Sequence, residues 1–198
     1  MEQQPNHSRR IARVGLIAAL YAAMTILTLT LLQGLAWGPV QLRVSEALCV
    51  LALFTPAAIP GLLVGCLIAN LIGLSITGSG LLGLLDVVFG SLATLLGALW
   101  MWRFRRRRLL AMLGPVLSNA LIVAAYLPII LAAFGFYTIP FTDIDLVGYY
   151  PAMYLFGFIS IAIGEALVIY GLGWPLAKLF EFSGLAARLS DTDKLDGD

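Results

Sequence analysis

Residues 37–61, WGPVQLRVSEALCVLALFTPAAIPG, bring two opposite charges, Arg43 and Glu46, to the mouth of an apolar run. Side chains three residues apart can face each other on one turn of a helix. The chain otherwise keeps charge out of its apolar runs, and a charged pair at the edge of a hydrocarbon layer is tolerated when it is paired, hydrated or reserved for a ligand. The surrounding sequence has to distinguish between these three roles.

The composition predicts a membrane protein that crosses the bilayer several times. Of the 198 residues, 61% are hydrophobic and only 12% are charged, and the mean hydropathy is +0.96. Soluble domains carry roughly 25% charged residues, so this chain has about half the charge needed to cover a water-facing surface. The formal net charge of +1 says little about partners, because the charges are segregated along the chain.

Six apolar segments predict an all-α membrane protein with six transmembrane helices. The first, 11–33, is too long for the apolar region of a signal peptide, about 7–15 residues, and long enough to cross about 30 Å of hydrocarbon. The second, 42–54, would cover only about 20 Å as an α-helix, so it must be tilted, partly re-entrant or extended by its flanking loop. The remaining helices are expected at 57–74, 84–104, 109–134 and 151–180.

The basic residues predict the orientation of these helices. Three groups of basic residues fall on one side when six helices are drawn, namely those of the N-terminal tail, of the cluster after the fourth helix and of the C-terminal end: Arg9, Arg10, Arg13, Arg103, Arg105, Arg106, Arg107, Arg108, Lys178 and Arg188. Positive charge in short flanks stays cytoplasmic, so we expect both termini inside the cell, with 1–10 and 182–198 as polar cytoplasmic tails around a transmembrane domain at 11–181. The arginine cluster after the fourth helix could alternatively bind anionic lipid or a cytoplasmic partner.

Polar residues inside the spans are the candidates for a substrate site. By depth, Arg43, Glu46, Asn70 and Asp86 share the outer leaflet, whereas Asn119 and Glu165 lie near the midplane. An ionisable side chain in a span usually faces the bundle interior or a cavity and marks function. The alternative is structural: Arg43 pairs with Glu46 or Asp86, and the asparagines join helices. Glu165 has no Lys or Arg within a turn, so it is protonated, hydrogen-bonded to another helix, or open to a donor-rich ligand.

Aromatic side chains gather at the same outer side, and Trp37 and Tyr126 are the candidates to contact a planar ligand. Most of the others fit a belt at the headgroup level: Phe136, Tyr137, Tyr149, Tyr150 and Tyr154. Cys49 and Cys66 lie in apolar runs without CxxC spacing, which predicts buried and unreactive thiols. His7 lies in a polar tail. We therefore expect no metal and no cofactor.

Small residues on the first helix form two pairs four residues apart, Ala18 with Ala22 and Ala19 with Ala23. Small residues on one face let another helix approach closely, and packing drives helix association in lipid. The partner is either another helix of this chain or a separate subunit. Nothing in the sequence resembles a phosphate loop, a zinc site or a nucleophile elbow, so we expect neither an enzyme nor a nucleic-acid partner.

Several blocks together resemble the QueT family, the substrate-binding S components of energy-coupling factor (ECF) transporters for queuosine precursors. The most specific are RVSEAL, FTPAAIPGL and DVVFGSLATL, and the likeness covers most of residues 11–181. The blocks are ARVGLIAALYAA at 12–23, GPVQLRVSEAL at 38–48, FTPAAIPGLLVGCLIANLIG at 54–73, DVVFGSLATLLGAL at 86–99 and PVLSNALIV at 115–123.

The resemblance implies a six-helix S-component bundle in the cell membrane of a prokaryote, with cytoplasmic termini. It also implies that the chain takes a vitamin-like substrate from outside and docks, through the small residues of its first helix, on a membrane T subunit that carries two cytoplasmic ATPases. The substrate site lies toward the outer face.

A 7-deazaguanine suits these residues chemically. Its Watson–Crick edge has two adjacent N–H donors that one carboxylate can accept, and Asp86, Glu46 and Glu165 are the candidates for that contact. Arg43 or an asparagine could donate to the exocyclic oxygen. Two other classes remain open: a self-sufficient proton-coupled transporter that uses Glu165 or Asp86, and a structural membrane protein. The small size and the lack of inverted repeats disfavour the transporter.

Overall fold

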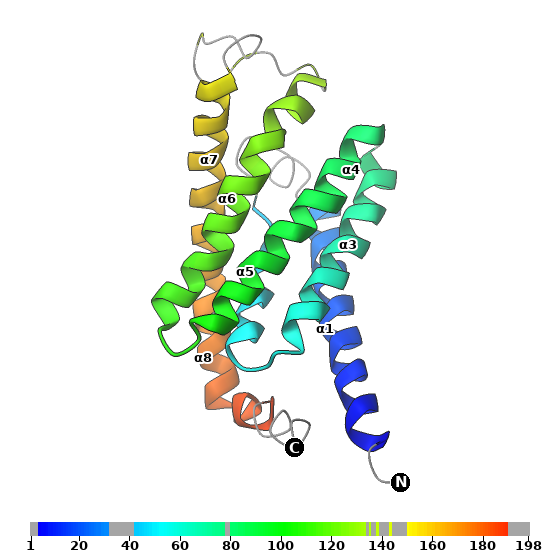
Figure 1. Cartoon of the computed structure of the whole chain (residues 1–198), viewed down its shortest axis with the longest axis vertical. Coiled ribbons are helices and arrows are strands. Elements are labelled where there is room, and N and C mark those ends of the chain that lie inside the picture. Colours follow the sequence, from blue (N-terminus) through cyan, green and yellow to red (C-terminus); the bar gives the residue numbers. More distant parts are fainter. Residues whose placement is uncertain are drawn as a thin grey trace.

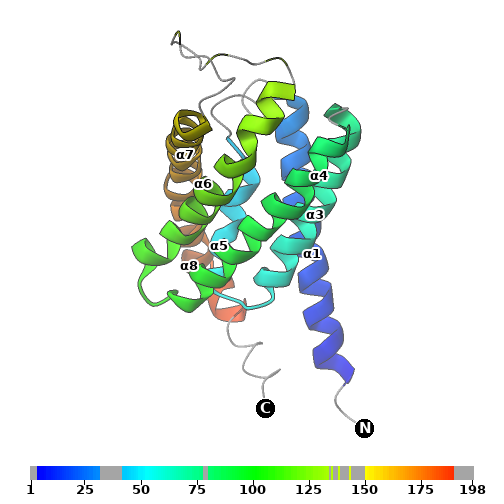
Figure 2. The ribbon, with the colours of Figure 1, turned by 45° about the horizontal axis from the view of Figure 1, so that its top comes forward.

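The chain folds into an all-helical bundle, seen here in a computed structural model that describes residues 4–31, 42–77, 80–133, 135, 138, 143 and 150–189. Within these residues, five helical stretches are long and apolar enough to cross a membrane. They run up and down, and both termini lie at the same end of the bundle, with the connection between α5 and α6 (Figure 1, Figure 2). The five spans are Ser8–Leu31, Ala58–Ile76, Gly80–Arg103, Arg108–Ala133 and Tyr150–Phe182.

Two of the five spans are α-helices interrupted by π-helical turns. The fourth predicted helix comprises η2 (Gly80–Leu82), α4 (Gly83–Leu85), the π-helical η3 (Asp86–Gly90) and α5 (Ser91–Arg103). The last comprises α7 (Tyr150–Ala166), the π-helical η4 (Leu167–Gly173) and α8 (Trp174–Phe182). The other three are α1 (Gln4–Leu31), α3 (Ala58–Thr77) and α6 (Arg108–Ala133).

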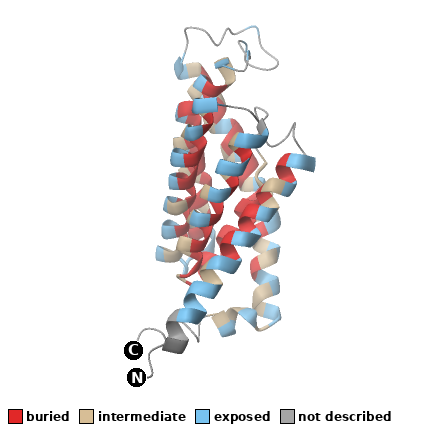
Figure 3. Cartoon of the chain, turned by 90° about the vertical axis from the view of Figure 1, so that its right-hand side faces the viewer, coloured by how far each residue is buried: buried red, intermediate tan, exposed pale blue. Residues whose placement is uncertain are grey.

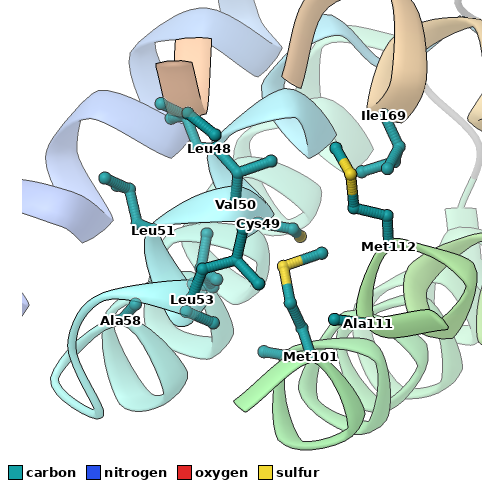
Figure 4. Close-up of a cluster of buried hydrophobic side chains, with 14 of the residues drawn as sticks. Leu48, Cys49, Val50, Leu51, Leu53, Ala58, Met101, Ala111, Met112 and Ile169 are labelled. Carbon is teal, nitrogen blue, oxygen red and sulfur yellow. The ribbon is translucent and has the colours of Figure 1, made fainter. Parts of the chain in front are cut away.

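The organising stretch of the sequence forms the centre of the bundle. Its apolar part is η1 (Val44–Leu53), a 3-10 helix in which every residue from Ser45 to Leu53 is buried. Figure 4 shows Met101 of α5 and Met112 of α6 pointing toward Cys49 and Val50 of this helix. A 3-10 helix rises about 2.0 Å per residue, so ten residues reach about 20 Å. The 3-10 form therefore makes η1 longer than an α-helix of the same ten residues would be.

The prediction of six crossings is confirmed only in part. The structure is all-helical with five long apolar helices, and η1 is the short sixth element. The crossing by η1 and the cytoplasmic side of the termini stay predictions. Three boundaries differ by three residues or more: α1 begins at Gln4, seven residues before the predicted start, α3 continues to Thr77, three residues past its predicted end, and the next span begins at Gly80, four residues before the predicted start. Pro5 does not prevent the early start, because a first-turn proline lacks only an N–H that would have no partner in the helix.

The helices α1 and α3 approach so closely that only glycine fits between them. A Cβ atom on Gly65 would lie 2.7 Å from the backbone oxygen of Ala18 and 2.8 Å from Cβ of Tyr21. A Cβ atom on Gly61 would lie 2.9 Å from Cβ of Ile17. Small residues spaced by four thus face α1 from α3, the arrangement that allows close helix packing in a membrane.

The outer surface of the bundle is apolar. Figure 3 shows buried residues along the inner faces of the helices and exposed residues along their outer faces over the whole height of the bundle. Many exposed side chains are large and hydrophobic, among them Leu27, Leu121 and Ile163. At the end that holds the termini, Arg108 of α6 donates two hydrogen bonds to the carboxylate of Glu181 of α8. Apolar outer faces with charged residues at one end are typical of a protein embedded in a lipid bilayer.

Candidate functional site

Asp86 forms the first part of a buried polar cluster between the central helix and three of the spans. Its Oδ1 atom accepts a hydrogen bond from Arg43 Nη2 at 3.2 Å, which is also an ion pair, and one from Tyr126 OH at 2.6 Å. Its backbone oxygen accepts a hydrogen bond from Asn70 Nδ2 at 2.8 Å. Gly90 lies beneath this group, and a Cβ atom there would lie 3.3 Å from Asn70 Nδ2 and 3.4 Å from Tyr126 OH. Four predicted site residues therefore meet at one place.

Glu46 forms the second part, deeper in the bundle. Its Oε1 atom accepts hydrogen bonds from Tyr21 OH and from Thr94 Oγ1, the latter at 3.1 Å. Its Oε2 atom accepts one from Cys49 Sγ at 3.1 Å. In a 3-10 helix, side chains three residues apart lie above one another, so the register of η1 places Glu46 and Cys49 on one side. Arg43 is the residue before this helix and contacts Asp86 from an extended backbone.

Three further polar atoms inside the bundle have no hydrogen-bond partner among the described residues. They are Ser91 Oγ, Asn119 Nδ2 and Glu165 Oε2, and all three are buried. A negative charge on Glu46 disfavours a negative charge on Glu165. A buried polar group without a partner costs about 1–3 kcal/mol, so three such atoms in one bundle require an explanation.

Irregular helix geometry coincides with these residues. The π-helix η3 begins at Asp86, and the π-helix η4 begins two residues after Glu165. The 3-10 helix η1 carries Glu46. π-helical turns are rare and are frequent at functional sites, and long 3-10 runs are uncommon. The three buried carboxyl side chains thus all lie on or beside non-α turns.

The structure decides between the two partners that the sequence left open for Arg43. Arg43 pairs with Asp86, on a different helix, and not with its neighbour Glu46. Tyr126 joins the cluster through its hydroxyl group. Trp37 lies outside the described residues, as do Phe136, Tyr137 and Tyr149 of the predicted belt. Tyr150 and Tyr154 stack with ring centroids 6.4 Å apart and donate to backbone oxygens of α6.

The predicted docking face divides into two halves. Ala18 and Ala22 are buried against the rest of the bundle, at 4% and 7% exposure, so they do not form an outward docking face. Ala19 and Ala23 are exposed. The spacing of four residues was correctly read as a packing signal, but it could not show which of the two adjacent pairs faces α3.

Sequence reasoning missed two residues that hold the site together, Tyr21 and Thr94. Both lie inside apolar spans and hydrogen-bond to Glu46. A second contact tightens the same region, where Thr25 Oγ1 donates to Ser45 Oγ at 2.7 Å. The available signal was the presence of a hydroxyl group in an apolar span, where such a group usually bonds to another helix. Cys49 and Cys66 are buried and free, as expected.

Metal ligands do not gather anywhere in the part of the chain that the structure describes: no group of three His, Cys, Asp or Glu side chains could hold an ion. The cluster instead offers one cation, three carboxyl groups, two amides and several hydroxyl groups. Such a set suits a polar organic molecule with both hydrogen-bond donors and acceptors.

A bundle of five long apolar helices around a buried polar cluster defines a multi-pass membrane protein with an internal polar site. The chain matches the family described as QueT transporter over residues 11–181, so it belongs to the QueT transporter family. A curated relative is the queuosine precursor transporter QueT of Lactococcus lactis subsp. cremoris, 39% identical over 100 residues.

That match covers 48% of this chain and 53% of the relative, so the chain spans about half the length of the curated relative it matches. No solved structure matches the chain. The expected family is thus confirmed by the family match over the transmembrane region.

Proposed function

We propose that the chain is the membrane-embedded S component of an ECF-type, ATP-driven importer in the cytoplasmic membrane of a prokaryote. It captures a queuosine precursor of the 7-deazaguanine type, such as preQ1, preQ0 or queuine, from outside the cell. A shared T subunit and two cytoplasmic ATPases then drive delivery. The name of the Lactococcus relative supports the substrate class, and the family membership supports transport.

The observation that carries this proposal is the polar cluster around Asp86, Glu46 and Glu165. It lies inside an otherwise apolar bundle, and its Asp86 part directly follows α4, which lies toward the end opposite the two termini (Figure 1). If the termini are cytoplasmic, as the basic residues predict, the Asp86 part is nearer to the outside. Both hydrogen-bond acceptors and donors are present, which a deazaguanine edge requires.

The exposed half of α1 supports a partner subunit. Ala12, Gly15, Ala19 and Ala23 are all exposed, and a Cβ atom on Gly15 would have no neighbour within 4 Å. These residues form a stripe of small side chains along the side of α1 that does not contact α3. Close packing against a membrane helix of a T subunit is the use of such a stripe that fits the proposed function.

Binding and uptake test the proposal separately. The detergent-purified chain should bind 7-deazaguanine compounds in calorimetry and rise in melting temperature, because a ligand that binds only the folded state stabilises it. Cells should accumulate the compound only when the T subunit and ATPases are produced with the chain. Uptake driven by a pH gradient into liposomes that contain the chain alone would instead support a proton-coupled transporter, for which the unpaired Glu165 carboxyl group is the supporting observation.

A further inference from the structure

The three buried carboxyl side chains of the site differ in what already occupies them. Asp86 has a cation, Arg43, and a hydroxyl donor, Tyr126. Glu46 accepts from three donors of the protein. Glu165 is 3% exposed, and no described residue donates a hydrogen bond to its Oε2 atom. Of the three carboxyl groups, Glu165 therefore has the most unused capacity to accept hydrogen bonds.

An unpaired donor lies at the same level of the bundle. Asn119 is 1% exposed, and its Nδ2 atom has no partner among the described residues. The helices α6 and α7 run in opposite directions and pack together, and Gly157 of α7 faces Ala124 and Leu127 of α6. Glu165 lies eight residues beyond Gly157, and Asn119 lies five to eight residues before the facing residues. With equal rise per residue, this brings Glu165 and Asn119 to about the same height.

The neighbours of Glu165 make an external donor favourable. Burial removes the water that would otherwise solvate a carboxyl group, and repulsion from Glu46 adds to the cost. The positive charge of Arg43 offsets part of that repulsion, but the described ion pair of Arg43 is with Asp86 and no described hydrogen bond joins it to Glu165. A ligand that brings N–H donors to Glu165 and an acceptor to Asn119 satisfies the orphaned atoms of both residues and leaves the Asp86 and Glu46 networks intact.

We propose that Glu165 and Asn119, and not Asp86 or Glu46, form the hydrogen bonds to the polar edge of the ligand. The ligand class is a planar heterocycle with two adjacent N–H donors beside a carbonyl oxygen, as in a 2-aminopyrimidin-4-one ring. Glu165 accepts from the ring N–H and the 2-amino group, and Asn119 donates to the carbonyl oxygen. This inference rests on the proposed function, because a 7-deazaguanine carries this edge.

The role of Glu165 is tested by a double-mutant cycle in which one change is made in the protein and the other in the ligand. The purified native chain and the Glu165→Gln variant are each titrated with 7-deazaguanine and with 7-deazahypoxanthine, which lacks the 2-amino group. We expect the native chain to prefer 7-deazaguanine at least tenfold. Glu165→Gln should lose most of that preference, because the glutamine oxygen can accept from only one of the two adjacent N–H groups and its NH2 group then faces the other. Melting curves without ligand verify that the variant is folded.

Glu46→Gln is the matched control, because it makes the same change in the other buried glutamate of the site. Its preference between the two compounds should equal that of the native chain, whatever happens to the overall affinity. An unchanged preference in Glu165→Gln, or a preference lost only in Glu46→Gln, would overturn the inference while the proposed function stands. If neither compound binds to the native chain, both fail.

Asn119 is tested with 2-amino-7-deazapurine, which lacks the carbonyl oxygen and, with it, the ring N–H beside it; the loss of this N–H affects the native chain and the Asn119 variant alike. The native chain should prefer 7-deazaguanine over this compound, and Asn119→Leu, which keeps the shape but removes the donor, should reduce that preference about tenfold. Equal preferences in the native chain and the variant would exclude Asn119 as the donor to the ligand.

Discussion

Arg43 and Asp86 illustrate how a residue can lie in a ligand site and still act mainly within the protein. Their side chains are 12% and 5% exposed and form an ion pair between the start of η1 and the π-helix η3. The cluster also includes Tyr126 from α6 and Asn70 from α3. The ion pair joins the central helix to one span, and the hydrogen bonds to Asp86 join two more spans to it. This cluster is next to the residues that we expect to contact the ligand.

Removing one member of this pair should destabilise the protein even without ligand. Arg43→Gln leaves the Asp86 carboxylate buried without its cation, and breaking such a pair costs about 3–5 kcal/mol. The double variant Arg43→Gln, Asp86→Asn removes both charges and should recover a large part of the loss. Unfolding of the purified, ligand-free protein, followed by heat or detergent titration, measures both. A double variant less stable than Arg43→Gln would show that the pair is not the cause.

At the scale of elements, two close contacts set the shape of the bundle. The narrow 3-10 helix η1 fits in the centre with Ser45 to Leu53 fully enclosed. Beside it, α1 contacts α3 across Gly61 and Gly65, which brings Tyr21 within hydrogen-bond distance of Glu46. The position of α1 against α3 therefore decides whether Glu46 keeps Tyr21 as one of its three donors.

Gly65→Ala should be destabilising because the added methyl group would meet the backbone of α1. Its Cβ atom would lie 2.7 Å from Ala18 O, where no flexible side chain can move away. Overpacking of this kind costs about 1–3 kcal/mol. Gly15→Ala is the control, since a Cβ atom there has no neighbour within 4 Å. Thermal unfolding of both variants should separate them, and equal melting temperatures would contradict the close α1–α3 contact.

For the whole molecule, α1 has two faces with different tasks. Ala18 and Ala22 are buried inside the bundle, whereas Ala19 and Ala23, one position along the helix, face outward. An isolated S component needs only the inner face to fold and bind its ligand. Under the proposed function, energy from the ATPases reaches this chain through the outer face, because the T subunit packs there.

Enlarging the outer face should therefore separate uptake from binding. Ala19→Leu with Ala23→Leu prevents a close approach by a partner helix but leaves the polar cluster unchanged. Uptake in cells that produce the T subunit and ATPases should fall at least tenfold, while calorimetry with the purified variant gives the native affinity. Ala125→Leu, at an exposed position of α6, serves as the control for added bulk in lipid. Equal loss of binding and uptake would refute a docking role.

The long helices were predictable because apolar length is a local property. The boundaries of 109–134 and 151–180 agree with the structure to within two residues. Most residues of the buried polar cluster were predictable as well, since charge and amide groups inside apolar spans are rare enough to identify by position, and their part in ligand binding stays a prediction. The pairing was not predictable, because Arg43 had two acidic candidates at similar depth and the sequence does not show how the helices rotate about their axes. Tyr21 and Thr94 were missed for the same reason.

The sequence by itself determined three features: that this protein belongs in a membrane, which residues form its long helices, and which few polar residues lie inside them. Each of these follows from composition and length. The tertiary structure decided the 3-10 form and central position of η1, the partner of Arg43 and the face on which each alanine of α1 lies. The physical reason is that these depend on the spacing and rotation of helices against each other. Those are set by contacts between residues far apart in the chain, such as Gly65 with Ala18.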